Sequence, residues 1–143
     1  MLNKEIISVS LPTLNLNDSV IQTLEMMDEF HVSQLPVVDN GKYLGLVFEE
    51  DLMNLPADSL LQAAGERLSK VAVRAESHFI EAIQMANDYH LSVVPVIEQE
   101  GEYTGAISAT DLLHHLGKLT GASEPGAIIV LEMEQRNFSF SEL

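Results

Sequence analysis

The feature that most constrains this chain is an internal repeat with a period of about 60 residues. Residues 31–38 read HVSQLPVV, and 59 positions later residues 90–97 read HLSVVPVI. Further on, residues 41–45 (GKYLG) return as residues 101–105 (GEYTG), now 60 positions later. The extra residue lies in the polar stretch between the two blocks, and turns tolerate such insertions. Because these landmarks recur in the same order, we expect two copies of one folding unit.

Each copy carries the same signals for local structure. In the first copy, Asp18 or Ser19 can cap a helix, and Ser19 with Gln22 has the spacing of a capping box. Ser77 is the corresponding predicted cap in the second copy. Asn40-Gly41, between two β-branched runs, predicts a tight hairpin turn. The predicted strands are 13–16, 35–38, 43–48, 71–75, 93–97 and 103–108, and further helices are expected over 49–54, 59–65 and 109–117.

Length and patterning together indicate a fold class. The chain has 143 residues, of which 46% are apolar, so it can bury a core without disulfides or metals. We predict an α/β (α+β) fold, in which two β-α-β-β-α repeats pack as a pseudo-two-fold pair. The expected divisions are a first repeat at 1–57, a linker at 58–69, a second repeat at 70–120 and a tail at 121–143. The helical residues expected in the core are Val20, Thr23, Leu24, Met27 and Phe30, and Phe79, Ile83, Ala86 and Tyr89.

Charge and cysteine content exclude several function classes. The sequence has 22 acidic and 7 basic residues, a net charge of −15, and a polyanion repels phosphate backbones and anionic lipid. We therefore expect no binding to nucleic acid or to a membrane surface. The absence of cysteine from the sequence excludes disulfides, thiolate metal sites and cysteine nucleophiles. Because the sequence has neither a long apolar run nor a leader-like stretch, we expect a cytoplasmic protein.

The repeated landmarks resemble a known family. A helix, His-x-Ser-x-x-Pro-Val, a hairpin and a later aspartate, all in tandem, resemble the cystathionine β-synthase (CBS) domain pair, or Bateman module. The resemblance covers residues 1–120. It implies a non-enzymatic regulatory module that binds an adenosine-containing ligand, such as AMP, ATP or S-adenosylmethionine, between the repeats. It also implies association into disc-shaped homodimers, and the alternative is a ligand-free dimerisation or interaction scaffold.

The second repeat carries a sequence similar to the family's nucleotide motif, Gly-h-h-Ser/Thr-x-x-Asp, at residues 105–111 (GAISATD). An ionised carboxylate can accept hydrogen bonds from both hydroxyls of a ribose, and a nearby hydroxyl can bond ribose or phosphate. Ser108 and Asp111 are therefore the leading site candidates, and the alternative is that Asp111 only caps its own helix. The resemblance further implies that the site is lined by Leu14, Asn15, Val32 and Ser33 from the first repeat, and by Ser92 and Ala106 from the second.

The first repeat departs from this motif, because Phe48 stands where the hydroxyl residue belongs. Asp51 is therefore expected to be a helix cap, and we expect at most one functional site per chain. Gln34 and Val93 stand where family members that hold phosphates often have basic residues. The expected ligand is then a neutral or singly phosphorylated adenosine, or S-adenosylmethionine with its own cation, unless the site has lost its ligand.

We predict no catalytic and no metal-binding residues. The sequence has no Ser–His–Asp order, HExxH, P-loop or dinucleotide glycine motif. Asp111 and His115 have the spacing of one helix face, but two ligands do not make a metal site. His31 and His90 are expected to close the first helix of each copy, where a cation is favourable.

The tail carries a second resemblance. Residues 127–134 (AIIVLEME) form a strand-like run, and Ser139 could then open a helix. This order is similar to the first strand and helix start of an ACT domain, as in bacterial CBS–ACT proteins, including those called acetoin-utilisation-like. It implies that the chain is part of a longer protein. The alternative is a tail that pairs with a sheet edge or with a second chain.

Overall fold

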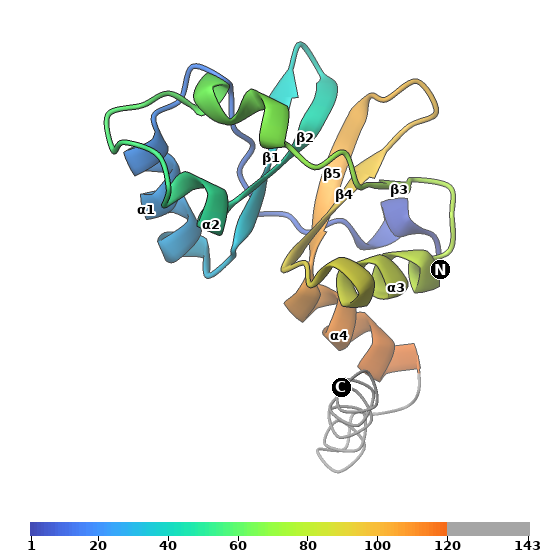
Figure 1. Ribbon diagram of the computed structural model, residues 1–143. Coiled ribbons are helices and arrows are strands. Elements are labelled where there is room, and N and C mark those ends of the chain that lie inside the picture. The colour runs from blue at the N-terminus through green and yellow to red at the C-terminus, as the bar shows by residue number, and fades with distance from the viewer. Residues whose placement is uncertain (120–143) are drawn as a thin grey trace.

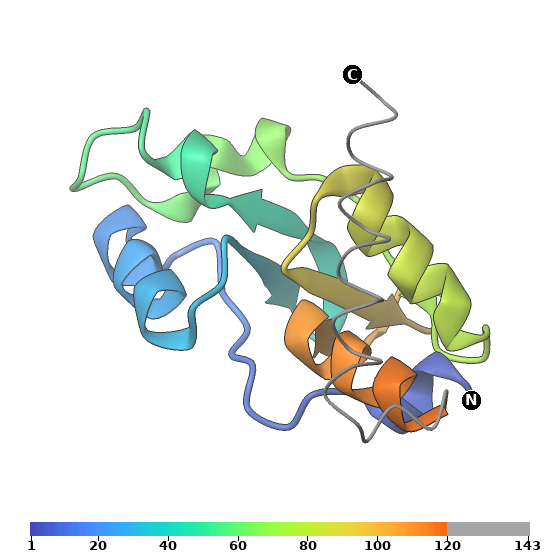
Figure 2. The ribbon, with the colours of Figure 1, turned by 90° about the horizontal axis from the view of Figure 1, so that it is seen from below.

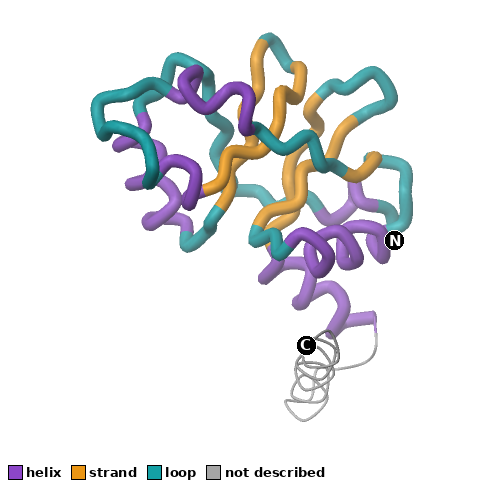
Figure 3. Tube along the Cα trace, viewed as in Figure 1, coloured by secondary structure: helices purple, strands orange, loops and turns teal. Residues whose placement is uncertain are grey.

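The computed structural model describes residues 1–119, which form two similar halves lying side by side (Figures 1 and 3). Helices and strands alternate, which confirms the expected α+β class. The predicted ACT-like tail lies outside the described residues. The first half contains α1 (Val20–Phe30), β1 (Gln34–Asp39), β2 (Lys42–Phe48) and α2 (Glu49–Leu52). The second contains β3 (Val73–Arg74), α3 (Phe79–Tyr89), β4 (Val93–Ile97), β5 (Tyr103–Ser108) and α4 (Ala109–Leu119).

Both hairpins form as the sequence predicts. β1 pairs with β2 in antiparallel fashion, and Asn40 and Gly41 between them have φ angles of 49° and 80°. These are the left-handed values that a tight hairpin turn requires. β4 and β5 form the equivalent hairpin, with β3 parallel to β4. The extended segment expected at 13–16 is shorter than predicted, because only a single parallel bridge joins Leu14 to Val37.

The repeated histidines end the first helix of each half. His31 after α1 and His90 after α3 have φ angles of 56° and 55°, in the left-handed region. Histidine is among the residues enriched in this conformation, so the helix end itself accounts for the recurring residue. At the start of α1, Ser19 Oγ accepts the Gln22 N–H at 3.1 Å, which confirms that Ser19 is the cap.

Three local predictions were wrong. His78, rather than Ser77, is the N-cap of α3, because its Nδ1 accepts the Ile80 N–H at 3.2 Å. The helix expected at 59–65 is instead a 3-10 helix, η2 (Leu61–Arg67). Tyr89 was expected in the core but is 54% exposed, because the buried positions of α3 are Phe79 and Ala82 near its start.

The chain segment that precedes each repeat packs against the other repeat. A second 3-10 helix, η1 (Asn3–Ile6), lies beside α3 and α4 of the second half, near the N-terminus (Figure 2). There the Phe79 N–H donates to Met1 O at 3.0 Å. In the first half, the Val20 N–H donates in the same way to Ser59 O of the linker at 2.9 Å. The N-terminal segment and the linker are therefore equivalent: each precedes one repeat in the sequence and packs against the other repeat.

The core is shared between the halves. Two hydrophobic clusters fill the interior, and each takes side chains from both repeats. The cluster centred on α1 and β1 includes Val93 and Ala106 from the second repeat. The cluster beneath α3 includes Leu46 from the first repeat, which is fully buried. Because apolar burial is the main stabilising term, neither repeat completes its core without the other.

The tips of the two hairpins also meet. The Tyr43 N–H donates to Gly101 O at 3.0 Å, and the Tyr103 N–H donates to Gly41 O at 2.8 Å. The two tyrosine rings stack with their centroids 6.3 Å apart. These reciprocal contacts place the pseudo-two-fold axis between the hairpins, as Figure 1 shows from the side-by-side position of the two pairs of strands.

Candidate functional site

A polar corner forms where β5 runs into α4. Ser108 is the last residue of β5, and Asp111 lies in the first turn of α4. Ser108 Oγ accepts the Asp111 N–H at 3.0 Å, so the serine hydroxyl is a cap of this turn. The Asp111 carboxylate therefore remains available to another donor. The structure thus brings the two leading sequence candidates together, and both are partly exposed.

A third residue, Ser8, completes this corner, and it was not predicted from the sequence. Ser8 Oγ donates to Asp111 Oδ2 and accepts the Ser108 N–H at 2.9 Å. It also lies 3.5 Å from Ser108 Oγ. The Ser8 N–H donates to Ala106 O at 2.8 Å, which fixes the main chain of the N-terminal segment against β5. A hydrogen bond to a carboxylate is of the strong, charge-assisted kind, so Ser8 belongs to the corner.

Ser8 has a structural counterpart in the first half. Ser69 is its counterpart in the first half, because the Ser69 N–H donates to Leu46 O at 3.0 Å, as the Ser8 N–H does to Ala106 O. Both serines stand just before the extended segment that opens a repeat. The exchange of these segments between the halves decides which corner each serine reaches, and this exchange is a property of the tertiary structure.

The apolar residues expected to line the site lie together in the hydrophobic core. Leu14, Val32 and Ala106 belong to the same hydrophobic cluster and are 2%, 8% and 2% exposed. Burial this deep leaves little of these side chains accessible to a ligand. Asn15, in contrast, is exposed, and its Oδ1 accepts the Asn17 N–H at 2.9 Å in the turn before α1.

The two serines of the His-x-Ser landmark meet across the repeats. Ser92 Oγ accepts the Ser33 N–H at 2.8 Å and donates to Gln34 Oε1 at 2.7 Å. Gln34 Oε1 also accepts the Ser92 N–H at 2.7 Å. Gln34 is 4% exposed, so it is a buried polar side chain whose hydrogen bonds tie the halves together. Ser33 and Ser92 were predicted as ligand-binding residues, but this network was not predicted.

The equivalent corner of the first repeat has different chemistry. Phe48 ends β2 where Ser108 ends β5, and Glu49, Glu50 and Asp51 form the first turn of α2. A cavity of about 550 Å³ lies beside this turn and reaches His90 at the end of α3. Its lining includes two aromatic rings, those of Phe48 and Tyr89, and the carboxylates of Glu49 and Glu50, which are unsuited to the phosphate of a nucleotide.

A second hollow lies between α3 and α4. Its volume is about 200 Å³, and its walls are mostly apolar side chains from the two helices, including Ile83, Leu112 and Leu113. Ile80 and Tyr89, both on α3, and Leu119 at the end of α4 are more than one-third exposed. An apolar helix face of this kind is a feature of association surfaces.

Among residues 1–119, no group of three His, Asp or Glu side chains is placed to hold a metal ion. His114 and His115 lie with their ring centroids 5.9 Å apart on α4. Within the same residues, every helix is too short or too polar to cross a bilayer.

Sequence comparison identifies the class of protein. A family model described as CBS domain matches residues 4–58 and again residues 68–118, so the chain belongs to the CBS domain family and carries the domain in tandem. A CBS domain-containing protein of Dictyostelium discoideum is 29% identical over 136 residues, which cover 83% of this chain and 93% of that protein. An inosine-5'-monophosphate dehydrogenase of Korarchaeum cryptofilum is 28% identical over 102 residues, which cover 71% of this chain but 21% of that enzyme.

Solved structures have the same fold. A CBS domain pair/ACT domain protein of Thermotoga maritima has a TM-score of 0.72 at 24% identity, covering 83% of this chain and 98% of that one. A structure described as an acetoin utilization protein of Vibrio cholerae has a TM-score of 0.69 at 20% identity, covering 87% and 98%. Two other CBS structures, each at 19% identity, are complexes: CBSX2 with AMP (TM-score 0.65, covering 83% and 98%), and a domain pair with 5'-methylthioadenosine and S-adenosyl-L-methionine (0.64, covering 87% and 98%).

Proposed function

We propose that this chain is a non-catalytic regulatory module that binds one adenosine-type ligand between its two repeats. The observation that carries the proposal is the polar corner, in which the carboxylate of Asp111 lies beside the hydroxyl of Ser108. The adenosyl ligands in two structures of the same fold support the choice of ligand class. The first repeat, with Phe48 at the equivalent position, offers no such corner, so one site per chain is proposed.

The corner suits a ribose. Two adjacent hydroxyls can both donate to the Asp111 carboxylate, because an ionised carboxylate offers about four acceptor positions. The hydroxyl of Ser108 can bond a second polar group of the ligand. The adenine would need apolar surface from the cluster that holds Val32 and Ala106, so binding would require some rearrangement of neighbouring residues.

The surroundings favour a ligand with little negative charge. Gln34 and Val93, at the positions where a basic residue could neutralise a phosphate, are uncharged and buried. The sequence as a whole carries a net charge of −15, which repels polyphosphates at a distance. We therefore propose that a neutral or singly phosphorylated adenosine, or S-adenosylmethionine, binds more tightly than ATP.

Regulation would follow from contact with both repeats. A ligand in this place would touch the second repeat at Asp111 and the N-terminal segment at Ser8, which leads into the first repeat. Such a ligand favours the relative arrangement of the halves that fits it best. An attached or partner domain would respond to the change in that arrangement.

Calorimetric titration with AMP, ATP and S-adenosylmethionine tests the proposal. We expect one binding event per chain for the preferred ligand, and its loss in Asp111→Ala, because the charged acceptor is removed. Asp51→Ala is the matched control, since Asp51 holds the equivalent position in the first repeat, and it should bind as the wild type does. The absence of heat with all three ligands, or equal losses in the two variants, would contradict the proposal.

The hollow between α3 and α4 supports a second candidate function, association of two copies into a homodimer. Burial of the exposed Ile80 and Tyr89 side chains would stabilise such a pair through the hydrophobic effect. Sedimentation of the protein across a hundredfold range of concentration tests this. If the sedimenting mass is that of one chain at every concentration, the homodimer proposal is contradicted, and the ligand-binding proposal is unaffected.

A further inference from the structure

The polar corner already contains a hydroxyl group. Ser8 Oγ donates to the carboxylate of Asp111 and accepts from the Ser108 N–H. A hydroxyl is both donor and acceptor, so it can satisfy a carboxylate and an amide at the same time. A ribose hydroxyl can also donate and accept, so it would form hydrogen bonds with the same two groups, the Asp111 carboxylate and the Ser108 N–H. Ser8 therefore stands where a ligand hydroxyl would form its hydrogen bonds.

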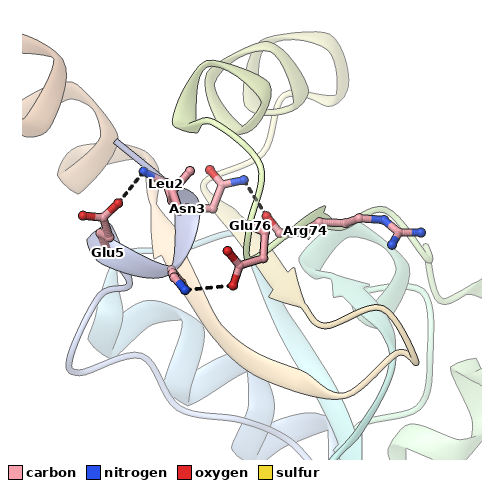
Figure 4. Close-up of polar contacts among 6 residues, drawn as sticks. Leu2, Asn3, Glu5, Arg74 and Glu76 are labelled. Atoms are coloured by element: carbon pink, nitrogen blue, oxygen red, sulfur yellow. Dashed lines mark hydrogen bonds and ion pairs between the residues drawn. The ribbon is translucent and has the colours of Figure 1, made fainter.

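The position of Ser8 is built into the fold. The Asn3 N–H donates to Ser77 O at 2.9 Å, and Asn3 Nδ2 donates to Arg74 O at 2.9 Å. Lys4 Nζ forms an ion pair with Glu76 at 2.8 Å. Figure 4 shows the hydrogen bond from Asn3 to Arg74 and the ion pair of Glu76, whose side chain is turned toward the N-terminal segment. Several independent contacts thus hold the segment to the second repeat.

The chain leaves this surface immediately after Ser8. Val9 is fully exposed and Ser10 is exposed, so the docked part of the segment ends at the corner itself. A rotation of the Ser8 side chain about its Cα–Cβ bond is enough to withdraw the hydroxyl from the corner. The main-chain bond from the Ser8 N–H to Ala106 O does not have to break for this to happen.

We infer that Ser8 sets the ligand affinity of this site by competing with the ligand for Asp111 and Ser108. This inference rests on the proposed function. The ligand must replace a charge-assisted hydrogen bond that the protein already has, so part of its own interaction is offset. A side chain at position 8 without a hydroxyl leaves the carboxylate and the Ser108 N–H to the ligand, and binding becomes tighter.

The experiment compares two side chains of almost the same shape. Threonine keeps the hydroxyl and valine replaces it with a methyl group, so Ser8→Thr and Ser8→Val differ in hydrogen bonding alone. We expect Ser8→Val to bind AMP or S-adenosylmethionine about tenfold more tightly than Ser8→Thr, which is the order of effect of one hydrogen bond to a charged group. Ser8→Thr should match the wild type within about threefold. Ser10→Val, at the exposed neighbouring position, should leave the affinity unchanged.

The outcomes separate the two proposals. If the wild type binds and Ser8→Val binds equally or more weakly, Ser8 orients Asp111 or plays no part, and the competition is overturned. If only Ser8→Val binds, the competition is supported in its strongest form. If neither the wild type nor Ser8→Val binds any of the ligands, the proposed function fails and the competition fails with it. Thermal unfolding of each variant shows whether the fold is intact.

Discussion

The two repeats have the same order of elements but different chemistry at one junction. In the second repeat, Ser108 and Asp111 meet Ser8 where the hairpin enters the helix. In the first repeat, Phe48 takes the place of Ser108 and packs against the apolar cluster of the second half. The backbone of this unit is thus the same in both repeats and depends on its turn, its apolar strands and its glycines. The side chain at the end of the second hairpin strand decides what the junction can bind.

A second difference lies on the axis between the repeats. Gln34 in the first repeat faces Ser92, whereas its equivalent in the second repeat is Val93, a fully buried apolar residue. Only one glutamine is needed, because its single Oε1 accepts both donors of Ser92. The pseudo-two-fold relation is therefore followed closely by the main chain and broken by individual side chains.

The largest expected effect compares the two hairpin glycines. A Cβ atom at Gly45 would lie 2.8 Å from Leu68 Cβ and 3.0 Å from Ser69 O, and the backbone there has a φ of 148°. At Gly105, where φ is 159°, the first clash is with Ile7 Cγ2 at 2.5 Å, and all the close atoms belong to one side chain, whereas Gly45 also meets a main-chain oxygen. We expect Gly45→Ala to lower the free energy of unfolding by about 3 kcal/mol and Gly105→Ala by roughly half as much. Urea unfolding measures both, and a greater loss for Gly105→Ala would contradict this ranking.

The next effect comes from making position 34 the same in both repeats. Gln34→Val removes the acceptor for the Ser92 N–H and the Ser92 hydroxyl, so we expect the free energy of unfolding to fall by about 2 kcal/mol. Ser92→Ala, alone and combined with Gln34→Val, completes a double-mutant cycle that isolates the interaction between the two side chains. Additive losses in this cycle would show that the hydrogen bonds do not couple the repeats.

The smallest effect concerns the stacked tyrosines. Tyr43 Oη donates to Val71 O at 2.7 Å, and we expect Tyr43→Phe to cost about 1 kcal/mol at neutral pH, and Tyr103→Phe less. Burial raises the pKa of Tyr103 to about 12 from an ordinary value of 10, and it raises the pKa of Tyr43 as well. Because the unfolded chain ionises first, the stability that each protonated ring contributes is complete below pH 10. For Tyr103 it is lost as the pH rises toward 12, and for Tyr43, whose pKa is raised further, the loss extends to higher pH.

The measurement is urea unfolding at a series of pH values from 7 to 11. The wild type should lose stability steeply above pH 10, and each phenylalanine variant should lose it less steeply, since one raised pKa has been removed. Identical pH profiles for the wild type and both variants would show that these hydroxyls do not titrate with unfolding.

Much of the fold could be predicted from short-range patterns. The hairpin at Asn40-Gly41 and the cap at Ser19 depend on neighbours within a few residues, so their sequence signals were sufficient. The cap of α3 was predicted wrongly, because the helix begins one residue later than expected and His78 Nδ1 supplies the acceptor. Tyr89 fitted the helical stripe but is exposed, because nothing in the periodicity shows where the facing surface ends.

The candidate site was predictable in part. Ser108 and Asp111 are three residues apart, and their proximity followed from the strand-to-helix junction. Ser8 lies 100 residues from Ser108 and carries no local signal, so only the packing of η1 on the second half brings it to the corner. The predicted lining residues Leu14 and Val32 are so deeply buried that the structure assigns them to the core.

The sequence alone determined that this chain is a tandem repeat, where its hairpins turn, and which repeat carries an aspartate beside a hydroxyl residue. These properties depend on the dihedral preferences of a few adjacent residues and on the spacing of apolar side chains. The tertiary structure decided which segment covers each repeat, and therefore that Ser8 meets Asp111. That choice follows from the burial of two cores that neither repeat completes by itself, a long-range balance of apolar surface that no local pattern expresses.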